Sequence, residues 1–579
     1  MTAPAVSPPA QMRIDRIERT LGDPAETANP AGHARLLAAD RAGVVCAEAE
    51  AVLDDFRMNE EFVPRGLGGR FDSPETLLRV VRAVFRRDVG LGMGYGMTTF
   101  MAASDVWMRG SAAQQRWLAD RLLGGAKAAI AQHETAHTND FVRSQVRADR
   151  AGGRLTVTGA KPVINNLDRA EALVLFCRTA EDRGSGNYSA LLLDPRQLPR
   201  ERYRITRRPS GDSVGLRGYF STGARFTGCP IPDDALLGPA GSGIVTSQLS
   251  FQMSRTLMAS LVVAGVDTSL RTAVRVDREL RPGLNAGDAA RPDNSAGTLT
   301  GAFVNLLLYD CLAVIATRSL QLRPAEASIY SAAIKSLLPK VLRDTMYDLA
   351  TVLGSQLYTR EGTVGVFQKH LRDVPIISLG HAGTAACQAT IIPQLGPLAR
   401  RSWFVEDPAP AALFQPGGGK LPAFSYDALA LAGHRDSLSA SLLAVADSMP
   451  GGGLVEQTLR TLAQLLVAEL SDLRHRVLDL EPVGTERAAN PAWFALVDRY
   501  ILVLAGAAVL GVWWHSDPVV DPFLADPAWA AAALHRITGR LGFRDVELPP
   551  QCAARVHQEV LARFGGGYGF DLYNTPLPY

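Results

Sequence analysis

Three stretches of the chain contain residues whose type and spacing could support chemistry. Residues 90–96, GLGMGYG, invite a dinucleotide-loop interpretation, but Tyr95 stands where the third glycine belongs, and a helical pattern rather than a strand precedes them. The GGGK stretch at 417–420 lacks the Ser or Thr after the lysine that a phosphate-binding loop uses to hold magnesium. His133 and His137 have the i, i+4 spacing of a zinc pair, but they lie where the sequence turns to strand. We expect loop glycines in the first two stretches and no metal site in the third.

The elements that must position any site follow from the hydrophobic pattern. Apolar residues recur at helical spacing from about 31 to 125, and short alternating segments separated by turn residues follow from 128 to about 237. Long helical patterns then return, interrupted by a Pro/Gly-rich linker, and this order excludes an alternating βαβ fold. We predict an α+β multidomain chain with a helical domain at 1–128, an antiparallel β-barrel at 129–237, a helix bundle at 238–403, a linker at 404–424 and a second C-terminal helical domain at 425–579.

Composition narrows the class of protein. The chain has 579 residues, of which 47% are apolar and 20% charged, so several domains can each bury a core and wholesale disorder is excluded. The net charge is +2, from 60 Lys and Arg against 58 Asp and Glu, which argues against the clustered cationic face of a nucleic-acid-binding protein. Arg far outnumbers Lys, which weakly indicates a GC-rich bacterial coding bias.

Cysteine usage and apolar runs predict the cellular location. The six cysteines are far apart and form no CxxC pair, as expected for reduced thiols. The N-terminal stretch MTAPAVSPPAQMRIDR lacks the apolar core of a signal peptide. The longest apolar run, Tyr500 to Trp514, is shorter than the roughly 20 residues that span a bilayer, so we expect a buried core helix there. These features predict a cytoplasmic protein with neither a membrane nor a nucleic acid as partner.

Five ordered segments resemble one family. AQHETAHTND (131–140) is similar to the flavin-contacting strand and loop of acyl-CoA dehydrogenases, and closer still to the AQTE and HGTN sequences of acyl-CoA oxidases. GAKPVINNLDRAEALVLFCRT (159–179) resembles the family's GxKxWITN segment and the strand after it. GLRGYFSTGARFTGCPIPDDALLGPAGSG (215–243) and LYTREGTVGVFQKHLRDV (357–374) resemble its GLRG and GYTRE runs. Upstream, WMRGSAAQQRWLADRLLGGAKAAIAQ (107–132) resembles the helix pair that leads into the family's barrel, and together these matches cover about residues 70–390.

The resemblance implies a fold, a cofactor and partners. The expected fold is the helix, β-barrel and helix-bundle scaffold of these flavoproteins, and the block after the linker is typical of the oxidase branch, which carries a second helical domain. The resemblance further implies FAD, and a substrate held as a thioester of coenzyme A or of a carrier protein. The family's FAD tail crosses a subunit boundary, which implies a homodimer or a larger homo-oligomer.

The family's flavin contacts can be carried over residue by residue. His133 falls where the family has a flavin-contacting Thr, Thr138 and Asn139 fall in its GSD loop, and both His and Asn can form hydrogen bonds. Asn165 and Asn166 follow Val163, which replaces the Trp that covers the ring, and a plain turn between strands is an equal interpretation of this pair. The remaining expected cofactor-binding residues are Arg278 and Gly354 at the pyrophosphate, and Thr384 in the GT match.

The family's catalytic base is the largest departure. Its glutamate would fall at Ala382 or at Gly380, and the sequence has no carboxylate between Val374 and Gln388. Some members carry the base on the first bundle helix instead, where this chain has Ser254 before Arg255, and we assign these two residues to substrate binding. His381 is the only titratable side chain in the segment, so we predict that it acts as the base, with a loop or helix-capping histidine as the alternative.

Four functional classes remain open from the sequence. The first is an FAD-dependent acyl-thioester oxidoreductase of bacterial secondary metabolism with a non-standard base. The second is a flavin-dependent monooxygenase on the same scaffold, which needs no base for an α-proton. The third is a non-catalytic subunit that pairs with a competent homologue, and the fourth is a flavin-free, non-redox enzyme.

Overall fold

The structure is a computed structural model. It describes residues 8–137, 143–151, 154–180, 184–207, 213–219, 222–280, 294–379, 383–449, 451–480 and 490–578. The chain forms two compact units, and each is described by itself. The sheet unit comprises Thr20–Ser254 and Ala423–Leu431, and the bundle unit comprises the described parts of Met1–Arg19, Arg255–Pro422 and Ala432–Tyr579.

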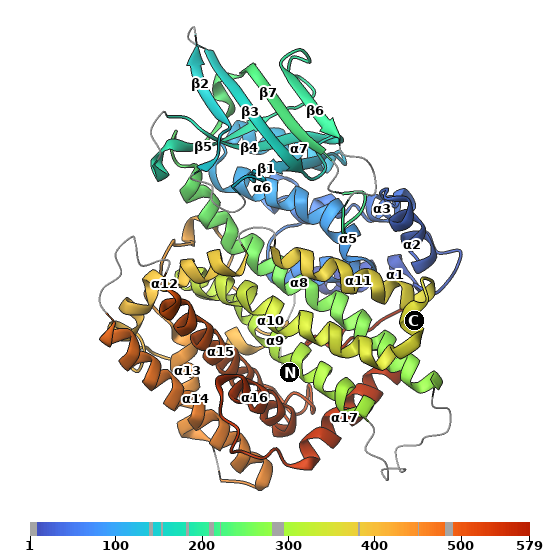
Figure 1. Ribbon diagram of the computed structural model, residues 1–579, viewed down its shortest axis with the longest axis vertical. Helices are drawn as coiled ribbons and strands as arrows, with labels where there is room; N and C mark the ends of the chain where they lie inside the picture. Colours follow the sequence, from blue (N-terminus) through green and yellow to red (C-terminus); the bar gives the residue numbers. More distant parts are fainter. Residues whose placement is uncertain are drawn as a thin grey trace. The chain divides into compact units, whose positions relative to one another are not determined.

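The helices that precede the sheet belong to the sheet unit, apart from nearly all of the first, and Figure 1 draws them in blue. They are α1 (Pro8–Leu21), α2 (His33–Ala42), α3 (Ala47–Phe56), α4 (Pro74–Arg87), α5 (Val89–Leu91), α6 (Thr98–Arg109) and α7 (Ala112–Leu123). Local sequence sets their starts: a capping box of Ser111 and Gln114 begins α7, and a proline in the first turn begins α4. Between α5 and α6 the chain forms a π-helix at Gly92–Met97.

This π-helix corrects one expectation from the sequence. The GLGMGYG glycines lie in helical backbone rather than in a loop. Glycine is needed there because large aromatic rings pack directly against this backbone. A Cβ on Gly94 would lie 1.7 Å from the Tyr219 ring, and one on Gly92 would lie 2.3 Å from that of Phe85. The second expectation is confirmed, since residues 417–420 form a turn with positive φ at Gly417 and Gly419.

The middle of the chain is a strand region, as expected. Its strands are β1 (Lys127–Ala131), β2 (Arg147–Ala151), β3 (Arg154–Ile164), β4 (Ala170–Arg178), β5 (Tyr188–Leu193), β6 (Tyr203–Arg207), β7 (Thr222–Ile231) and β8 (Leu236–Leu237). They pair in the order β6-β7-β3-β2-β4-β5-β8, and β1 also pairs with β4. The pairings of β1 and β2 with β4 are parallel and the others antiparallel. Among the described residues β6 and β8 do not pair, so the sheet is open and a closed antiparallel barrel is not confirmed.

Strand β4 is buried on both of its faces. Leu173, Leu175 and Cys177 join the core on one side of the sheet. Val174 and Phe176 alternate with them and pack on the other side, in a cluster that includes residues of α6 and α7. A strand covered on both faces reads as a continuous apolar run, which is the character of the ALVLFC sequence in β4. Helices α6 and α7 therefore cover one face of the sheet, and the core formed by the strands themselves lies on the other face.

The bundle unit is helical throughout its regular elements. Its first set comprises most of α8 (Gly243–Leu280) with α9 (Asn294–Leu322), α10 (Ala327–Leu353), α11 (Gly362–Leu379) and α12 (Thr384–Arg401). Its second set comprises α13 (Ser437–Ser448), α14 (Leu454–Asp479), α15 (Pro491–Trp514), α16 (Pro527–Leu541) and α17 (Pro550–Gly565). Helix α9 packs against α10 and also against α15 and α17, so the two sets share one interior (Figure 1).

The order of helices, strands and helices is as predicted from the sequence, whereas the bounds of the five predicted segments remain predictions. Three helices are long and apolar enough to cross a membrane: α8, α9 and α15. Their most apolar windows are 100%, 100% and 78% buried inside the protein, respectively. The run from Tyr500 to Trp514 is thus the end of a 24-residue core helix, longer than its sequence indicated.

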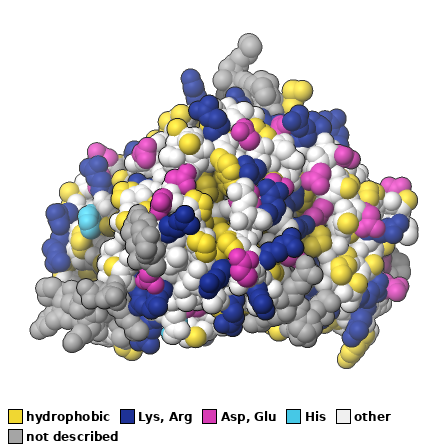
Figure 2. Space-filling view, turned by 90° about the horizontal axis from the view of Figure 1, so that it is seen from above, with side chains coloured by type: hydrophobic (Ala, Val, Ile, Leu, Met, Phe, Trp, Pro, Cys, Tyr) yellow, Lys and Arg dark blue, Asp and Glu magenta, His cyan; other side chains and the backbone are white. Residues whose placement is uncertain are grey.

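The surface carries charges of both signs. On the face drawn in Figure 2, Lys and Arg side chains are interspersed with Asp and Glu side chains and with apolar ones. This face is not the clustered cationic surface that binding to nucleic acid requires.

Candidate functional site

A buried ion pair fixes the segment that follows β1. The Lys161 ammonium donates to Glu134 Oε1 at 3.0 Å, to Ser144 Oγ at 2.9 Å and to the Gln132 carbonyl at 3.0 Å. Glu134 also accepts from the backbone N–H groups of Gln145 and Val146. Burial favours the neutral carboxyl, but Lys161 and these hydrogen bonds outweigh it and hold the pKa of Glu134 below its ordinary value. Glu134 is therefore a structural carboxylate.

The same segment spells HETAH, which matches the letters of the zinc motif HExxH. That motif works on a helix, whereas His133 and Glu134 here follow a strand, and His137 lies in the turn after them. Within the described part of the chain, no group of three or more His, Cys, Asp or Glu side chains could hold a metal ion. His133 itself is half-buried beside the ion pair.

Asn165 and Asn166 hold the turn between β3 and β4 against the π-helix. Asn166 donates to the Gly94 carbonyl at 2.5 Å and has a left-handed φ of 60°. Arg169 donates to the Asn166 side-chain oxygen and forms a two-bond ion pair with Glu50, at 2.6 and 2.9 Å. Asn165 donates to Thr98 Oγ1 at 3.2 Å. Both asparagines have a positioning role, and their contact with a flavin remains a prediction.

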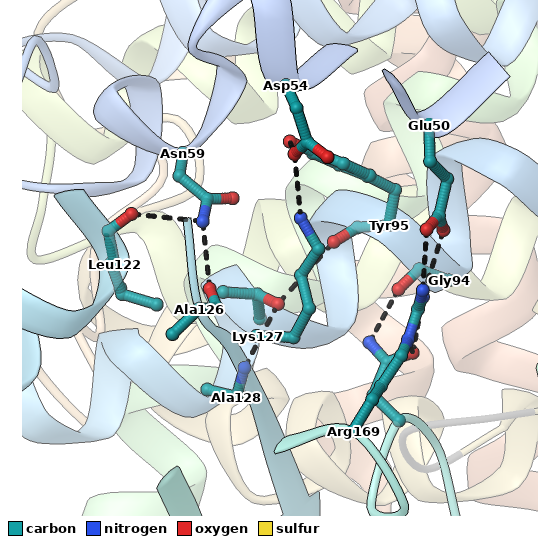
Figure 3. Close-up of polar contacts among 12 residues, drawn as sticks. Glu50, Asp54, Asn59, Gly94, Tyr95, Leu122, Ala126, Lys127, Ala128 and Arg169 are labelled. Atoms are coloured by element: carbon teal, nitrogen blue, oxygen red, sulfur yellow. Dashed lines mark hydrogen bonds and ion pairs between the residues drawn. The ribbon is translucent and has the colours of Figure 1, made fainter. Parts of the chain in front are cut away.

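Lys127, at the start of β1, lies over the ring of Tyr95. Its Nζ is 3.4 Å from the ring centroid and 3.3 Å from Asp54 Oδ1, and Asp54 also accepts a hydrogen bond from the Tyr95 hydroxyl (Figure 3). Burial lowers the pKa of Lys127 despite Asp54, and burial with Asp54 raises the pKa of Tyr95. At neutral pH the tyrosine is thus a neutral phenol that fixes the π-helix to α3 and β1.

Asp105 is a fully buried carboxyl group on α6, with an exposed fraction of 0%. Burial raises the pKa of Asp105 to about 7, and the nearby Ser250 opposes the shift. Ser250 donates to the Ser247 carbonyl, and Ser247 Oγ accepts from Gln132 at 2.5 Å. A polar path of Gln132, Ser247 and Ser250 therefore joins the end of β1 to the start of α8, and both carboxyl oxygens of Asp105 lack a hydrogen-bond partner among the described residues.

Several buried oxygens around this polar path have no partner among the described residues. They are Gln132 Oε1, Asn165 Oδ1, Thr246 Oγ1 and Ser254 Oγ. A buried polar atom left unpaired costs about 1–3 kcal/mol, so such atoms are rare and concentrate where a ligand or water is held. Ser254 lies one helical turn after Ser250 on α8.

In the bundle unit, Lys335 contacts α11 and Arg255 contacts α12. The Lys335 ammonium donates to the Ile377 carbonyl near the end of α11, where a cation is favourable. Burial lowers the pKa of Lys335 to about 8 despite the Cys387 thiol, and Arg255 adds to this effect. Arg255 is 2% exposed and donates to Thr390 Oγ1 at 3.2 Å.

The RD pair that matches the family motif anchors α11. Asp373 accepts from Lys369 at 2.8 Å and from Arg372 at 2.8 Å, and its side chain is fully buried. The two cations hold the pKa of Asp373 below its ordinary value against the opposing effect of burial. His370 contacts the Gly265 carbonyl at 3.1 Å. The helix that leads to the expected catalytic segment is thus fixed by buried polar contacts.

The remaining sequence-predicted residues are scattered along the chain. His381, Thr138 and Asn139 lie outside the described residues. Arg278 is exposed near the end of α8, with its guanidinium carbon 5.6 Å from the centroid of Phe564. Gly354 follows α10 with a φ of 51°, and Thr384 is the half-buried first residue of α12.

The sequence analysis missed Asp105 and Lys335. Each is a lone charged residue inside an apolar helical stretch, TTFMAASDVWM for Asp105 and SIYSAAIKSLL for Lys335. That signal, a charge at a position where helical periodicity predicts burial, was available from the sequence.

Comparisons with known proteins agree with this architecture. No protein-family model matches the chain. Isovaleryl-CoA dehydrogenase of Oryza sativa subsp. japonica is 22% identical over 229 residues, which are 39% of this chain and 55% of that protein. The match thus spans about half of that relative. The probable acyl-CoA dehydrogenase FadE25 of Mycobacterium tuberculosis is 22% identical over 356 residues, 60% of this chain and 86% of that protein.

Solved structures show the same fold. A Bacillus anthracis acyl-CoA dehydrogenase complexed with FAD superimposes with a TM-score of 0.68 at 12% identity, over 98% of this chain and 96% of that one. The prolyl acyl carrier protein oxidase AnaB superimposes with a TM-score of 0.56 at 15% identity, over 67% and 99%. The fold is therefore that of the acyl-CoA dehydrogenases, with the C-terminal helices included in the longer match. Both the sequence and the fold of this chain are thus similar to those of acyl-CoA dehydrogenases.

Proposed function

We propose that the chain is an FAD-dependent oxidoreductase that removes two hydrogens from an acyl thioester. The observation that carries this proposal is the likeness over 98% of the chain to an acyl-CoA dehydrogenase that binds FAD. FAD, when bound, supplies the hydride acceptor, and the protein supplies orientation and proton transfer.

The residues of the sheet unit fit such a cofactor. Gln132 Oε1, Asn165 Oδ1 and Thr246 Oγ1 are buried acceptors without partners in the described residues. All three lie near β1. Gln132 directly follows this strand and donates to Ser247, the residue after Thr246. Asn165 donates to Thr98, and the neighbouring Thr99 accepts from the backbone of β1. The flavin ring has an N–H group that needs such an acceptor, so we assign these residues to its polar edge together with His133.

The α-proton of the substrate needs an acceptor other than the family glutamate. We propose two candidates, His381 from the sequence and Asp105 from the geometry. Asp105 has a pKa near neutrality and lies close to Ser250, which is one helical turn before Ser254, the alternative base position. The base would take the α-proton while the β-hydrogen leaves with its electron pair. Arg255, next to Ser254, would face the thioester.

The test begins with the purified protein. Flavin bands near about 370 and 450 nm in the visible spectrum are expected if FAD is retained. Anaerobic addition of acyl-CoA substrates, and in a second arm of acyl carrier protein thioesters, should bleach the 450 nm band. A colourless protein that does not take up added FAD would overturn the proposal and favour a non-redox enzyme.

The base is tested by substitution. The rate of flavin reduction should fall by about 10² to 10⁴ in either His381→Gln or Asp105→Asn, whichever residue is the base, while bound flavin is unchanged. If both variants reduce flavin at the wild-type rate, neither residue is the base. Flavin that no thioester reduces would favour the monooxygenase or the non-catalytic partner subunit.

The location and biological setting are also proposals. All six cysteines are free and buried, which supports a reducing compartment such as the cytoplasm. The likeness to an acyl carrier protein oxidase supports a role in secondary metabolism, with a carrier protein as a partner.

A further inference from the structure

A cavity of about 620 Å³ lies in the bundle unit, where α9, α16 and α17 approach one another (Figure 1). This volume is within the range of small-molecule sites, roughly 300–1,000 Å³. The residues that line it are different from those assigned above to FAD or to the thioester. Most of them are small and apolar: Ala296, Gly297, Gly301, Val304, Ala532, Gly539, Leu548, Ala553 and Ala554.

One strong cation faces this cavity. Arg536 of α16 donates to Asn305 Oδ1 at 3.3 Å, and this is its one hydrogen bond within the described part of the chain. Asn305 in turn donates to Thr345 Oγ1 at 3.0 Å, which fixes its oxygen toward the guanidinium. No carboxylate of the described residues lies within ion-pair distance of Arg536. Burial lowers the pKa of Arg536 and its neighbour Arg540 lowers it further, while the more distant charge of Asp348 opposes the shift without forming an ion pair.

The facing helix, α9, has room for the guanidinium of Arg536. A Cβ on Gly301 of α9 would lie 2.1 Å from Arg536 Nη2, so glycine at this position lets the guanidinium lie against the helix. Buried arginines are normally neutralised by a carboxylate, because an unpaired charge is costly to remove from water. Arg536 keeps most of its five N–H donors available, and they can hold a carboxylate or a phosphate with two parallel hydrogen bonds.

Two histidines and the start of α9 complete the polar part of the lining. His557 of α17 lies with its Nδ1 3.1 Å from Thr300 Oγ1, and His535 Nε2 contacts the Val546 carbonyl at 3.1 Å. Ala296 and Gly297 belong to the first turn of the 29-residue α9, the end at which a helix favours anions. Among the described residues, the lining contains no Asp or Glu.

We propose that this cavity binds a small organic anion, with its carboxylate or phosphate head on Arg536 and a short apolar body against the Ala and Gly surfaces of α9, α16 and α17. The site is separate from the proposed FAD chemistry and does not depend on it.

Isothermal titration calorimetry on the full chain as purified tests the proposal without using enzyme activity. The probes are hexanoate, hexyl phosphate and inorganic phosphate, with hexylamine as the probe of opposite charge. We expect a hexyl anion to bind and hexylamine to give no heat. Hexanoate binding more tightly than hexyl phosphate indicates a carboxylate site, and the reverse order indicates a phosphate site. Inorganic phosphate measures the contribution of the head group alone.

Three variants locate the binding. Arg536→Gln should weaken the preferred anion by about tenfold or more, the usual effect of losing a charge-assisted hydrogen bond. Gly539→Leu should block the cavity without a clash, since a Cβ on Gly539 meets no atom within 4 Å. Arg540→Gln is the matched control, because Arg540 is exposed, donates to the Lys340 carbonyl and does not line the cavity.

Two results would overturn the proposal. One is the absence of measurable heat with every anion. The other is binding that Arg536→Gln and Gly539→Leu leave unchanged, or that Arg540→Gln weakens equally. Wild-type thermal stability in each variant, measured by circular dichroism, shows that a loss of binding is not a loss of fold.

Discussion

Asp105 shows how much a single buried carboxyl can influence the molecule. Burial raises its pKa from 3.8 to about 7, so the folded protein retains a proton that the unfolded chain releases. The stability contributed by this proton is complete below pH 4 and is lost as pH rises to about 7. Asn would fill the same space without this loss of stability, so a carboxyl group at position 105 indicates a functional role.

The first prediction concerns the stability of Asp105→Asn. Between pH 5 and pH 8 the variant should gain about 2 to 3 kcal/mol in unfolding free energy relative to wild type. Urea denaturation at the two pH values measures this difference. Asp120→Asn, an exposed position on α7, is the control and should show no such gain. An Asp105→Asn variant that follows the wild type at both pH values would mean that the carboxyl is hydrated and its pKa ordinary.

The second prediction concerns the ion pair of Glu134 and Lys161. Lys161→Met leaves a buried carboxylate without its cation and should cost about 3–5 kcal/mol of unfolding free energy at pH 7. Glu134 has a lowered pKa, so the pair contributes stability above pH 4.5 that is lost as pH falls through the folded-state pKa. Lys161→Met should therefore approach wild type in acid. Urea denaturation curves at pH 7 and pH 3.5 test this prediction. An equal loss of unfolding free energy at both pH values would show that the effect of Lys161→Met comes from packing alone.

At the scale of elements, the apolar patterns predicted most of the architecture. The continuous apolar run ALVLFC and the alternating segments around it predicted the strands, and long three- and four-residue periodicities predicted the bundle helices. The π-helix was not predictable, since GLGMGYG shows only that small residues are needed. The reason for them is the distant rings of Tyr219 and Phe85, which only tertiary packing brings close.

The same limit applies to the candidate site. Resemblance located Asn165 and Asn166, but their bonds to Thr98 and to Gly94 join segments about 70 residues apart. The burial of Asp105 and Lys335 likewise depends on which helices cover them. Sequence showed that the family glutamate is absent, and structure was needed to find titratable groups elsewhere.

The third prediction tests the π-helix. Gly94→Ala places a Cβ 1.7 Å from the Tyr219 ring, a clash that the ring must relieve by moving, so we expect a loss of about 1–3 kcal/mol or more. Gly66→Ala is the matched control, since its Cβ meets no atom within 4 Å. Urea denaturation should separate the two variants clearly. Equal stability of both would show that Gly94 is not tightly packed.

At the scale of the whole molecule, the cofactor proposal carries a consequence for assembly. In the superfamily that the chain resembles, the FAD tail crosses a subunit boundary, and the two residues expected to meet it are exposed in this protomer. Arg278 lies near the end of α8 and Gly354 follows α10. Exposed cofactor residues are what a site completed by a second copy would leave on a single chain.

The fourth prediction is that the protein is at least a homodimer, and that FAD and dimerisation stabilise each other. If FAD binds only the dimer, it shifts the monomer–dimer equilibrium toward the dimer by mass action. Light scattering at micromolar concentration should give a dimer mass or larger with FAD present, and FAD removal should shift the mass toward the monomer on dilution. Arg278→Gln should reduce this FAD dependence, while Arg343→Gln, an exposed arginine on α10 outside the expected cofactor set, should leave it unchanged. A monomer that retains stoichiometric FAD at these concentrations would show that this chain holds its cofactor within one subunit, against the arrangement that the superfamily resemblance implies.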